Sequence, residues 1–152
     1  MKKCNEVMTK DPVCCLPTDN VAKAAQLMKD ENIGSIPVIE NEQSHTLVGI
    51  VTDRDLALTI VAEGRDAKST LVEAVMTHKL VTCLADDDLQ KALGAMAEHQ
   101  LRRILVVDHE NRIVGIIAQA DVATRLDEPE STGEMVKEIS QDQPFANDSL
   151  GG

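Results

Sequence analysis

The stretch Leu47-Val48-Gly49-Ile50-Val51-Thr52-Asp53-Arg54-Asp55 decides the fold, because it leads an apolar run directly into a Thr-x-x-Asp corner. The apolar residues around the glycine predict a buried strand, and the apolar-rich segment after Asp55 predicts a helix. At such a corner the first helical N–H groups are unpaired and the helix dipole is positive. The stretch therefore predicts a place where an anion can bind.

The same pattern recurs as Ile113-Val114-Gly115-Ile116-Ile117-Ala118-Gln119-Ala120-Asp121, so the chain contains an internal repeat. Val7-Met8-Thr9 recurs as well, as Val75-Met76-Thr77. The two methionines lie 68 residues apart and the two glycines 66 apart, so the second copy is two residues shorter. Matching positions through a whole unit predict two copies of one fold.

Each copy predicts the element order β-α-β-β-α, which makes the chain an α/β (α+β) protein of two repeats packed as one pseudo-two-fold module. In the first copy we expect strands at 13–16 and 35–39, a buried strand that starts at Leu47 and ends at the Thr-x-x-Asp corner, and helices ending near residues 32 and 62. In the second copy we expect a helical lead-in at 71–76, strands at 80–83, 104–107 and 113–118, and helices at 87–100 and 119–126. The predicted domains are repeat 1 (7–62), a linker (63–71), repeat 2 (72–126) and an acidic, partly disordered tail (127–152) with one short helix at 132–139.

Composition narrows the class of protein. Apolar residues make up 43% of the chain, with no Trp or Tyr and one Phe, so the core must be aliphatic. The formal net charge is −11, and an acidic chain argues against DNA or RNA as the main partner. No apolar run has the length of a membrane span, so we expect a soluble, cytoplasmic protein.

The four cysteines, Cys4, Cys14, Cys15 and Cys83, form no Cys-x-x-Cys pair. Buried free thiols are the expected state. The alternative is a metal site that combines a thiolate with His78 or His45, although no spacing supports it.

The chain resembles the cystathionine-β-synthase (CBS) domain family. The resemblance covers residues 7–126 and rests on Val-Met-Thr at both unit starts, Ser35-Ile36-Pro37-Val38, and the segment from Val48 to Asp55. It implies that the repeats form one compact module, that two modules pair as a homodimer, and that clefts between the repeats bind AMP, ADP, ATP or S-adenosylmethionine. It implies a regulatory sensor with an unidentified effector protein, not an enzyme, with an adenine nucleotide as ligand and no required cofactor.

Thr52 and Asp55 are the principal candidates for ligand binding in the first copy. An ionised Asp55 can accept two hydrogen bonds from a ribose diol, and the Thr52 hydroxyl can bond a phosphate. The same two residues also match a capping box, in which Thr52 caps the helix and Asp55 reaches back. Both roles can hold in one protein, because a cap in the empty state can be reused when ligand arrives.

The second copy departs from this pattern, because Ala118 stands where Thr52 stood. Asp121 matches Asp55, so the resemblance carries the ribose role to Asp121 but no phosphate role to Ala118. We therefore expect unequal sites, with the first one tighter.

Basic residues are the candidates for phosphate contacts. In the family, basic side chains before the middle strand often reach phosphates, and the resemblance places Arg102 and Arg103 there, with Arg54 as a further candidate. The alternative is a solvated pair balanced by nearby acids. The segment Ile36-Pro37-Val38 is the candidate aliphatic wall for a base.

The sequence leaves three rival functions open. One is a metal- or redox-responsive module that uses the cysteines, and another is a structural dimerisation module whose clefts stay empty. The third is an enzyme, but no nucleophile–histidine spacing, Gly-x-x-x-x-Gly-Lys loop or Gly-x-Gly-x-x-Gly fingerprint is present.

Overall fold

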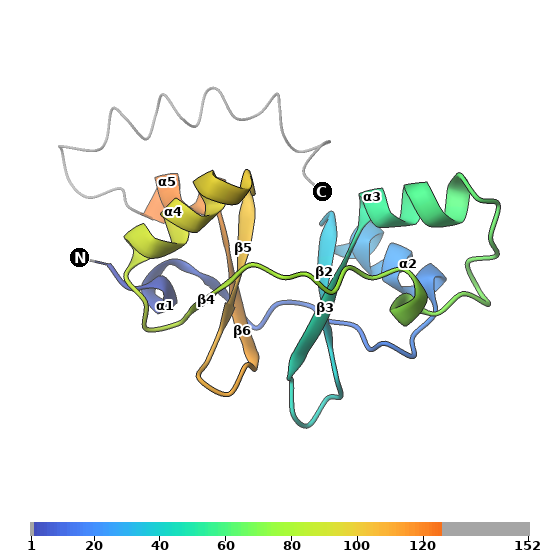
Figure 1. The fold of residues 1–152 in the computed structure, drawn as a ribbon, viewed down its shortest axis with the longest axis horizontal. Coiled ribbons are helices and arrows are strands. Elements are labelled where there is room, and N and C mark those ends of the chain that lie inside the picture. Colours follow the sequence, from blue (N-terminus) through green and yellow to red (C-terminus); the bar gives the residue numbers. More distant parts are fainter. Residues whose placement is uncertain (1, 126–152) are drawn as a thin grey trace. The chain divides into compact units, whose positions relative to one another are not determined.

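The computed structural model describes residues 2–125 (Figure 1). The predicted tail at 127–152 and its short helix at 132–139 lie outside the described residues. The mixed α/β class with two β-α-β-β-α repeats is confirmed. The chain forms two compact units, which we name by their acids: the Asp55 unit (residues 12–80 and 110–113) and the Asp121 unit (residues 2–11, 81–109 and 114–125).

The Asp55 unit begins with α2 (Val21–Glu31), whose apolar periodicity produces a buried face of Val21, Ala24 and Met28. Asn20 caps its start, because the side chain accepts the Lys23 N–H at 2.8 Å. The helix ends at Asn32, which adopts a left-handed conformation with φ of 56°. Sequence period and caps therefore account for both limits of this helix.

Strands β2 (Ser35–Ile39) and β3 (Leu47–Thr52) form an antiparallel pair in which Ser35 faces Thr52. The chain then enters α3 (Asp53–Leu56), which continues as a π-helical turn, Ala57–Val61. A 3-10 helix at Val72–Ala74 follows the connecting segment. The strand expected at 13–16 is reduced to one parallel bridge between Cys15 and Val38.

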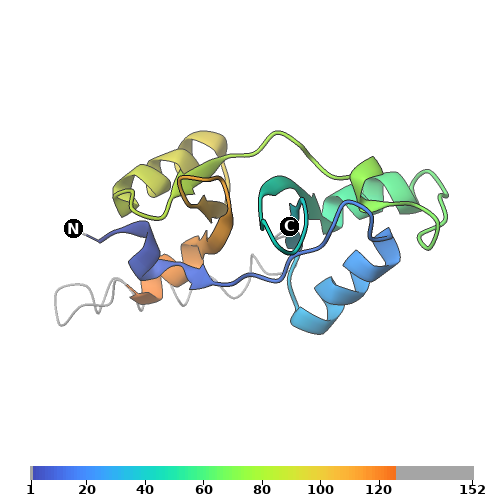
Figure 2. The same cartoon turned by 90° about the horizontal axis from the view of Figure 1, so that it is seen from below.

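The Asp121 unit contains a four-stranded sheet in the order β1-β6-β5-β4. Its strands are β1 (Thr9–Lys10), β4 (Thr82–Leu84), β5 (Arg103–Val107) and β6 (Ile113–Ala118), and its helices are α1 (Cys4–Val7), α4 (Leu89–His99) and α5 (Gln119–Arg125). Figure 2 shows α1 beside α5, although they lie at opposite ends of the described chain. Across residues 2–125, none of the helices combines the length and apolar content that a membrane crossing needs.

The segment at the start of each repeat, which we call its lead-in (residues 2–11 for the first repeat and 71–77 for the second), packs in the unit that holds most of the other repeat. A Cβ atom on Gly49 would lie 2.8 Å from Met76 Sδ and 3.1 Å from the Thr77 carbonyl oxygen. A Cβ atom on Gly115 would overlap Met8 Sδ and lie 2.9 Å from the Thr9 carbonyl oxygen. Each glycine is therefore needed because a Met-Thr segment crosses it closely.

Candidate functional site

The corner at the end of β3 forms a complete capping box. The Asp55 N–H donates to Thr52 Oγ1 at 3.0 Å, and the Thr52 N–H donates to Asp55 Oδ2 at 3.0 Å. The capping interpretation is thus confirmed. A carboxylate has about four acceptor positions, and the cap uses one of them, so Asp55 can still accept bonds from a ligand.

A third residue, which the sequence pattern does not single out, joins this corner. Thr77 Oγ1 lies 3.5 Å from Asp55 Oδ1 and 3.4 Å from Asp55 Oδ2. Its backbone is fixed by reciprocal bonds with Ile50, at 2.8 Å from the Thr77 N–H and 3.0 Å from the Ile50 N–H. The recurrence of Met-Thr at both lead-ins indicates that this threonine matters, but the sequence does not show which residue it contacts.

The Asp121 unit repeats this contact, because Thr9 Oγ1 donates to Asp121 Oδ2 at 3.5 Å. Hydroxyl–carboxylate bonds are normally shorter, near 2.5–3.0 Å. Both acids are therefore held only weakly by their threonines, and a ligand hydroxyl can replace these contacts. Each unit brings one acid and one lead-in threonine together at a strand–helix corner.

The arginines predicted to contact phosphate lie in different units: Arg54 in the Asp55 unit, and Arg102 and Arg103 in the Asp121 unit. The Gln119 N–H donates to the Arg102 carbonyl oxygen at 2.9 Å, which places the Arg102 backbone beside the start of α5 and hence near Asp121. Arg103 is half-buried at the start of β5. The Asp55 unit has the same backbone bond, from the Asp53 N–H to Gly34, so it has a glycine where the other unit has Arg102. Arg54 is exposed on α3.

The candidate aliphatic wall lies deeper than the acids. Ile36, Pro37 and Val38 are fully buried on β2, and Ile36 and Val38 belong to the core of the Asp55 unit. Contact with a ligand stays a prediction for all three.

An apolar hollow of about 380 Å³ opens elsewhere on the Asp55 unit, between α2 and the α3–π-helical segment. Its lining residues are Val21, Ala25, Met28, Asp53, Leu56, Ala57, Ile60, Val61 and Ala67. Asp53 rather than Asp55 reaches it, and none of the predicted ligand residues lines it. The hollow and the acidic corner are therefore separate features of this unit.

The cysteines are free thiols in the structure. Burial raises the pKa of Cys14 to about 11 and that of Cys15 to about 12, and it also raises the pKa values of Cys4 and Cys83. Protonated thiols are poor metal ligands and nucleophiles. Within residues 2–125, no three His, Cys, Asp or Glu side chains are arranged to hold a metal ion.

Comparison with known proteins identifies a protein family with this architecture. The family model described as "CBS domain" matches residues 4–62 and again 72–128. The CBS domain-containing protein YhcV of Bacillus subtilis is 39% identical over 140 residues, covering 92% of this chain and 96% of that protein. The CBS domain pair of protein MJ0100, solved in complex with methylthioadenosine and S-adenosyl-L-methionine, shares 25% identity with a TM-score of 0.70, covering 83% of this chain and 95% of that one.

Hypoxic Response Protein I, solved with two coordinated zinc ions, shares 28% identity with a TM-score of 0.72, covering 81% of this chain and 98% of that one. The duplicated strand–helix corners, the duplicated lead-ins and the two family-model matches agree along the chain. The chain therefore belongs to the CBS domain family and carries two copies of that domain.

Proposed function

We propose that this protein is a regulatory module that binds an adenosine-containing ligand (AMP, ADP, ATP or S-adenosylmethionine) at the Asp55 and Asp121 corners. The observation that carries the proposal is the pairing, in both units, of a carboxylate and a weakly bonded lead-in hydroxyl. The solved MJ0100 pair, with its two adenosine compounds, supports the choice of ligand class. The ligand reports to an effector protein, and the module itself performs no chemistry.

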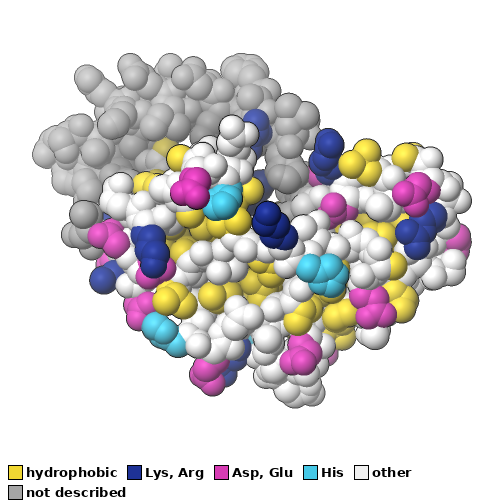
Figure 3. Space-filling model, viewed as in Figure 1, with side chains coloured by type: hydrophobic (Ala, Val, Ile, Leu, Met, Phe, Trp, Pro, Cys, Tyr) yellow, Lys and Arg dark blue, Asp and Glu magenta, His cyan; other side chains and the backbone are white. Residues whose placement is uncertain are grey.

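Each candidate residue has a role in this proposal. Asp55 and Asp121 accept hydrogen bonds from the ribose diol, because an ionised carboxylate is an acceptor for paired donors. Thr52, Arg54, Arg102 and Arg103 bind phosphate, and guanidinium groups suit phosphate oxygens. Ile36, Pro37 and Val38 form the aliphatic wall on which the base rests. On the face drawn in Figure 3, the basic and acidic side chains of the described residues are interspersed, which suits a small ligand better than a nucleic acid.

Calorimetric titration of AMP, ADP, ATP and S-adenosylmethionine into the full chain tests the proposal. We expect at least one of them to bind and to raise the melting temperature with the logarithm of its concentration above the Kd, because it binds the folded state only. If none of the four produces heat or a thermal shift at millimolar concentration, the structural module with empty clefts replaces our proposal. Metal analysis of the purified chain tests the metal-responsive alternative in the same preparation.

Ala118→Thr is expected to strengthen the weaker corner. The new hydroxyl caps α5, which should stabilise the protein by about 1 kcal/mol, and it supplies the phosphate donor that the Asp121 unit lacks. Thermal unfolding measures the effect on stability, and calorimetric titration with AMP measures the effect on affinity at the second site. Ala120→Thr is the control, because it adds a hydroxyl inside the helix where it cannot cap; equal behaviour of both variants would contradict the prediction.

The proposed partner also includes a second copy of this chain. Leu58 and Val61, on the helical segment that follows Asp55, are 51% and 78% exposed, and a second copy would remove them from water. Val61→Asp should weaken the dimer by about tenfold or more, because it replaces buried apolar surface with a charge. Sedimentation equilibrium measures this.

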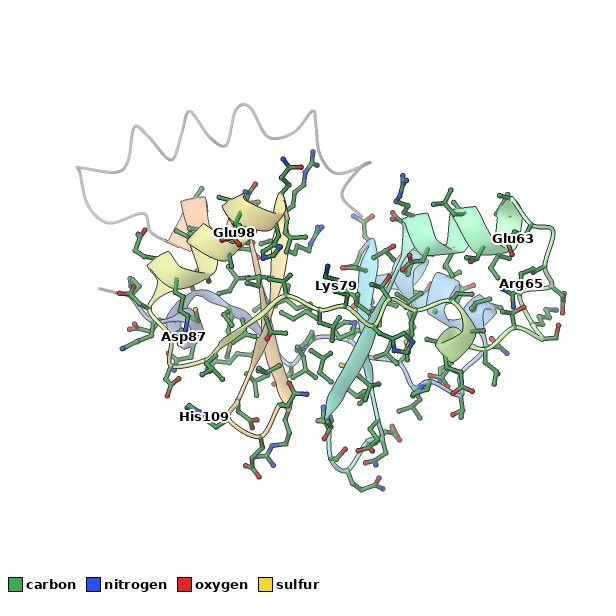
Figure 4. All side chains as sticks on the ribbon, in the orientation of Figure 1. Glu63, Arg65, Lys79, Asp87, Glu98 and His109 are labelled. Atoms are coloured by element: carbon green, nitrogen blue, oxygen red, sulfur yellow. The ribbon has the colours of Figure 1, made fainter. Side chains whose placement is uncertain are left out.

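The control for the dimer prediction is Glu63→Gln in the neighbouring turn, where Glu63 and Arg65 form an exposed ion pair at 3.9 Å (Figure 4). It removes a charge without removing apolar surface, so we expect the dimer to be unchanged. A wild-type chain that is monomeric at all accessible concentrations would contradict the dimer.

A further inference from the structure

Arg103 lies opposite Ala118, at the corner that leads to Asp121. Strands β5 and β6 are joined by a short turn and are neighbours in the sheet, so they run antiparallel. The Gln119 N–H donates to the Arg102 carbonyl oxygen at 2.9 Å, and in an antiparallel pair this bond places the next residues inward directly opposite each other. Opposite side chains start about 4.5–5.5 Å apart on one face of the sheet, so the Arg103 side chain begins beside Ala118.

The Asp55 unit has the same backbone geometry with different side chains. Ser35 lies opposite Thr52, and the flanking bond runs from the Asp53 N–H to the Gly34 carbonyl oxygen at 2.9 Å. Here the hydroxyl stands on the strand that enters the helix, and a glycine and a buried serine stand on the facing strand. In the Asp121 unit Ala118 offers no polar group, and the facing strand carries two arginines. The anion donor has therefore moved from one strand to the other.

The formal charges of the two corners differ in sign. Residues 34–35 and 52–55 include Asp53, Arg54 and Asp55, which leave one negative charge. The matched residues 102–103 and 118–121 include two arginines and Asp121, which leave one positive charge. Guanidinium groups stay charged at every physiological pH. A more highly charged anion is therefore favoured at the Asp121 corner and not at the Asp55 corner.

We infer that the two corners bind different phosphorylation states of adenosine. The Asp121 corner binds the diphosphate or triphosphate, and the Asp55 corner binds an adenosine compound with one phosphate group or none. This inference rests on the proposed function, which places an adenosine ligand at each corner. Arg103 makes the anion contact that Ala118 cannot make, and Arg102 binds the additional phosphates. At the Asp55 corner additional phosphates gain little, because Asp53 offsets Arg54.

Each corner is measured alone by calorimetric titration of the full chain in which the acid of the other corner is replaced. Asp55→Asn leaves the Asp121 corner, and Asp121→Asn leaves the Asp55 corner. Divalent cations are omitted, so that they do not compensate the phosphate charge. We expect ATP to bind the Asp121 corner at least about tenfold more tightly than AMP, whereas ATP should have no such advantage at the Asp55 corner. Added salt should reduce this advantage.

Arg103→Ser gives the Asp121 corner the residue that the Asp55 corner has. In the Asp55→Asn chain we expect it to weaken ATP binding by about tenfold and to leave the binding of adenosine, which has no phosphate, unchanged. A merely structural role of Arg103 would weaken both ligands. Arg112→Ser is the matched control, because Arg112 lies at the opposite end of β6, in an exposed ion pair with Glu110. Six residues of strand separate it from Ala118 by about 20 Å, well beyond the screening length of about 8 Å.

Gly34→Arg is the reverse exchange, made in the Asp121→Asn chain. It gives the Asp55 corner the counterpart of Arg102, and we expect it to raise the affinity for ATP relative to AMP. Among the described glycines only Gly64 has a positive φ, so the backbone at residue 34 does not require glycine. This variant tests the inference even if Arg103→Ser fails to fold.

The outcomes separate this inference from the proposed function. Equal ratios of ATP to AMP affinity at the two corners, equal losses of ATP and adenosine binding in Arg103→Ser, or no gain for ATP in Gly34→Arg would each overturn the inference and leave the proposed function intact. If no adenosine compound binds the wild-type chain, both are wrong.

Discussion

Asp55→Asn weakens AMP binding at least 100-fold while it leaves the melting temperature within a few degrees of the wild type. The asparagine keeps one side-chain oxygen for the Thr52 N–H, so the capping box that is closed at 3.0 Å survives in large part. The asparagine has no charge, and its NH2 group is a donor where the carboxylate had an acceptor. This NH2 group cannot accept a hydrogen bond from a ribose hydroxyl. Hydrogen bonds to a charged group contribute about 1.5–3 kcal/mol each, and losing two of them gives at least this factor.

Asp88→Asn is the matched control for the Asp55 substitution. Asp88 caps α4, and its carboxylate accepts the Gln90 N–H at 3.2 Å, so the chemical change at a helix start is the same. We expect unchanged AMP affinity in this variant. Unchanged affinity in Asp55→Asn would remove Asp55 from the site, whereas an equal loss in both variants would indicate a general effect on folding.

Gly115→Ala lowers the free energy of unfolding by about 2–3 kcal/mol, because the new Cβ has no room beneath the first lead-in. It would meet Met8 Cγ at 2.7 Å and the Thr9 carbonyl oxygen at 2.9 Å, and a backbone oxygen cannot rotate away. Gly49→Ala costs less, because its nearest atom belongs to the flexible Met76 side chain and its nearest backbone oxygen is 3.1 Å away. Thermal unfolding should show a fall of about 5–10 °C for Gly115→Ala.

Gly94→Ala is the control for these glycine substitutions. Gly94 lies in the middle of α4, and a Cβ there would have nothing within 4 Å. Alanine is the better helix former by about 1 kcal/mol, so this variant should melt higher than the wild type. A double-mutant cycle with Met8→Ala measures the coupling to Gly115, and zero coupling would contradict the close crossing of the lead-in.

Elements with a clear apolar period could be predicted from the sequence. The face of α2 and the limits of β2, β3 and β6 follow from residue spacing, caps and the repeat. The strand expected at 13–16 could not form a ladder, because Pro12 and Pro17 bracket it and lack N–H donors. Only the Cys15 backbone pairs there, with bonds of 3.0 Å to Pro37 and Ile39.

The site was harder to predict, since its parts meet only in the folded chain. The Thr-x-x-Asp spacing identified Thr52 and Asp55, but the local pattern could not separate a cap from a ligand site because both use the same atoms. Thr77 and Thr9 were missed because hydropathy describes neighbours along the chain, whereas these contacts come from the lead-in of the other repeat. The family was confirmed, while the roles of the site residues stay predictions.

The crossing of the lead-ins has a consequence for how the nascent polypeptide is completed on the ribosome. The Asp55 unit consists almost entirely of the continuous segment 12–80, so its core can close while translation is still under way. Residues 2–11 emerge earlier, yet β6 and α5, against which they pack, are translated last among the described residues. The earliest part of the described chain is therefore the part that must wait longest for its partner, exposed to proteases and chaperones in the meantime.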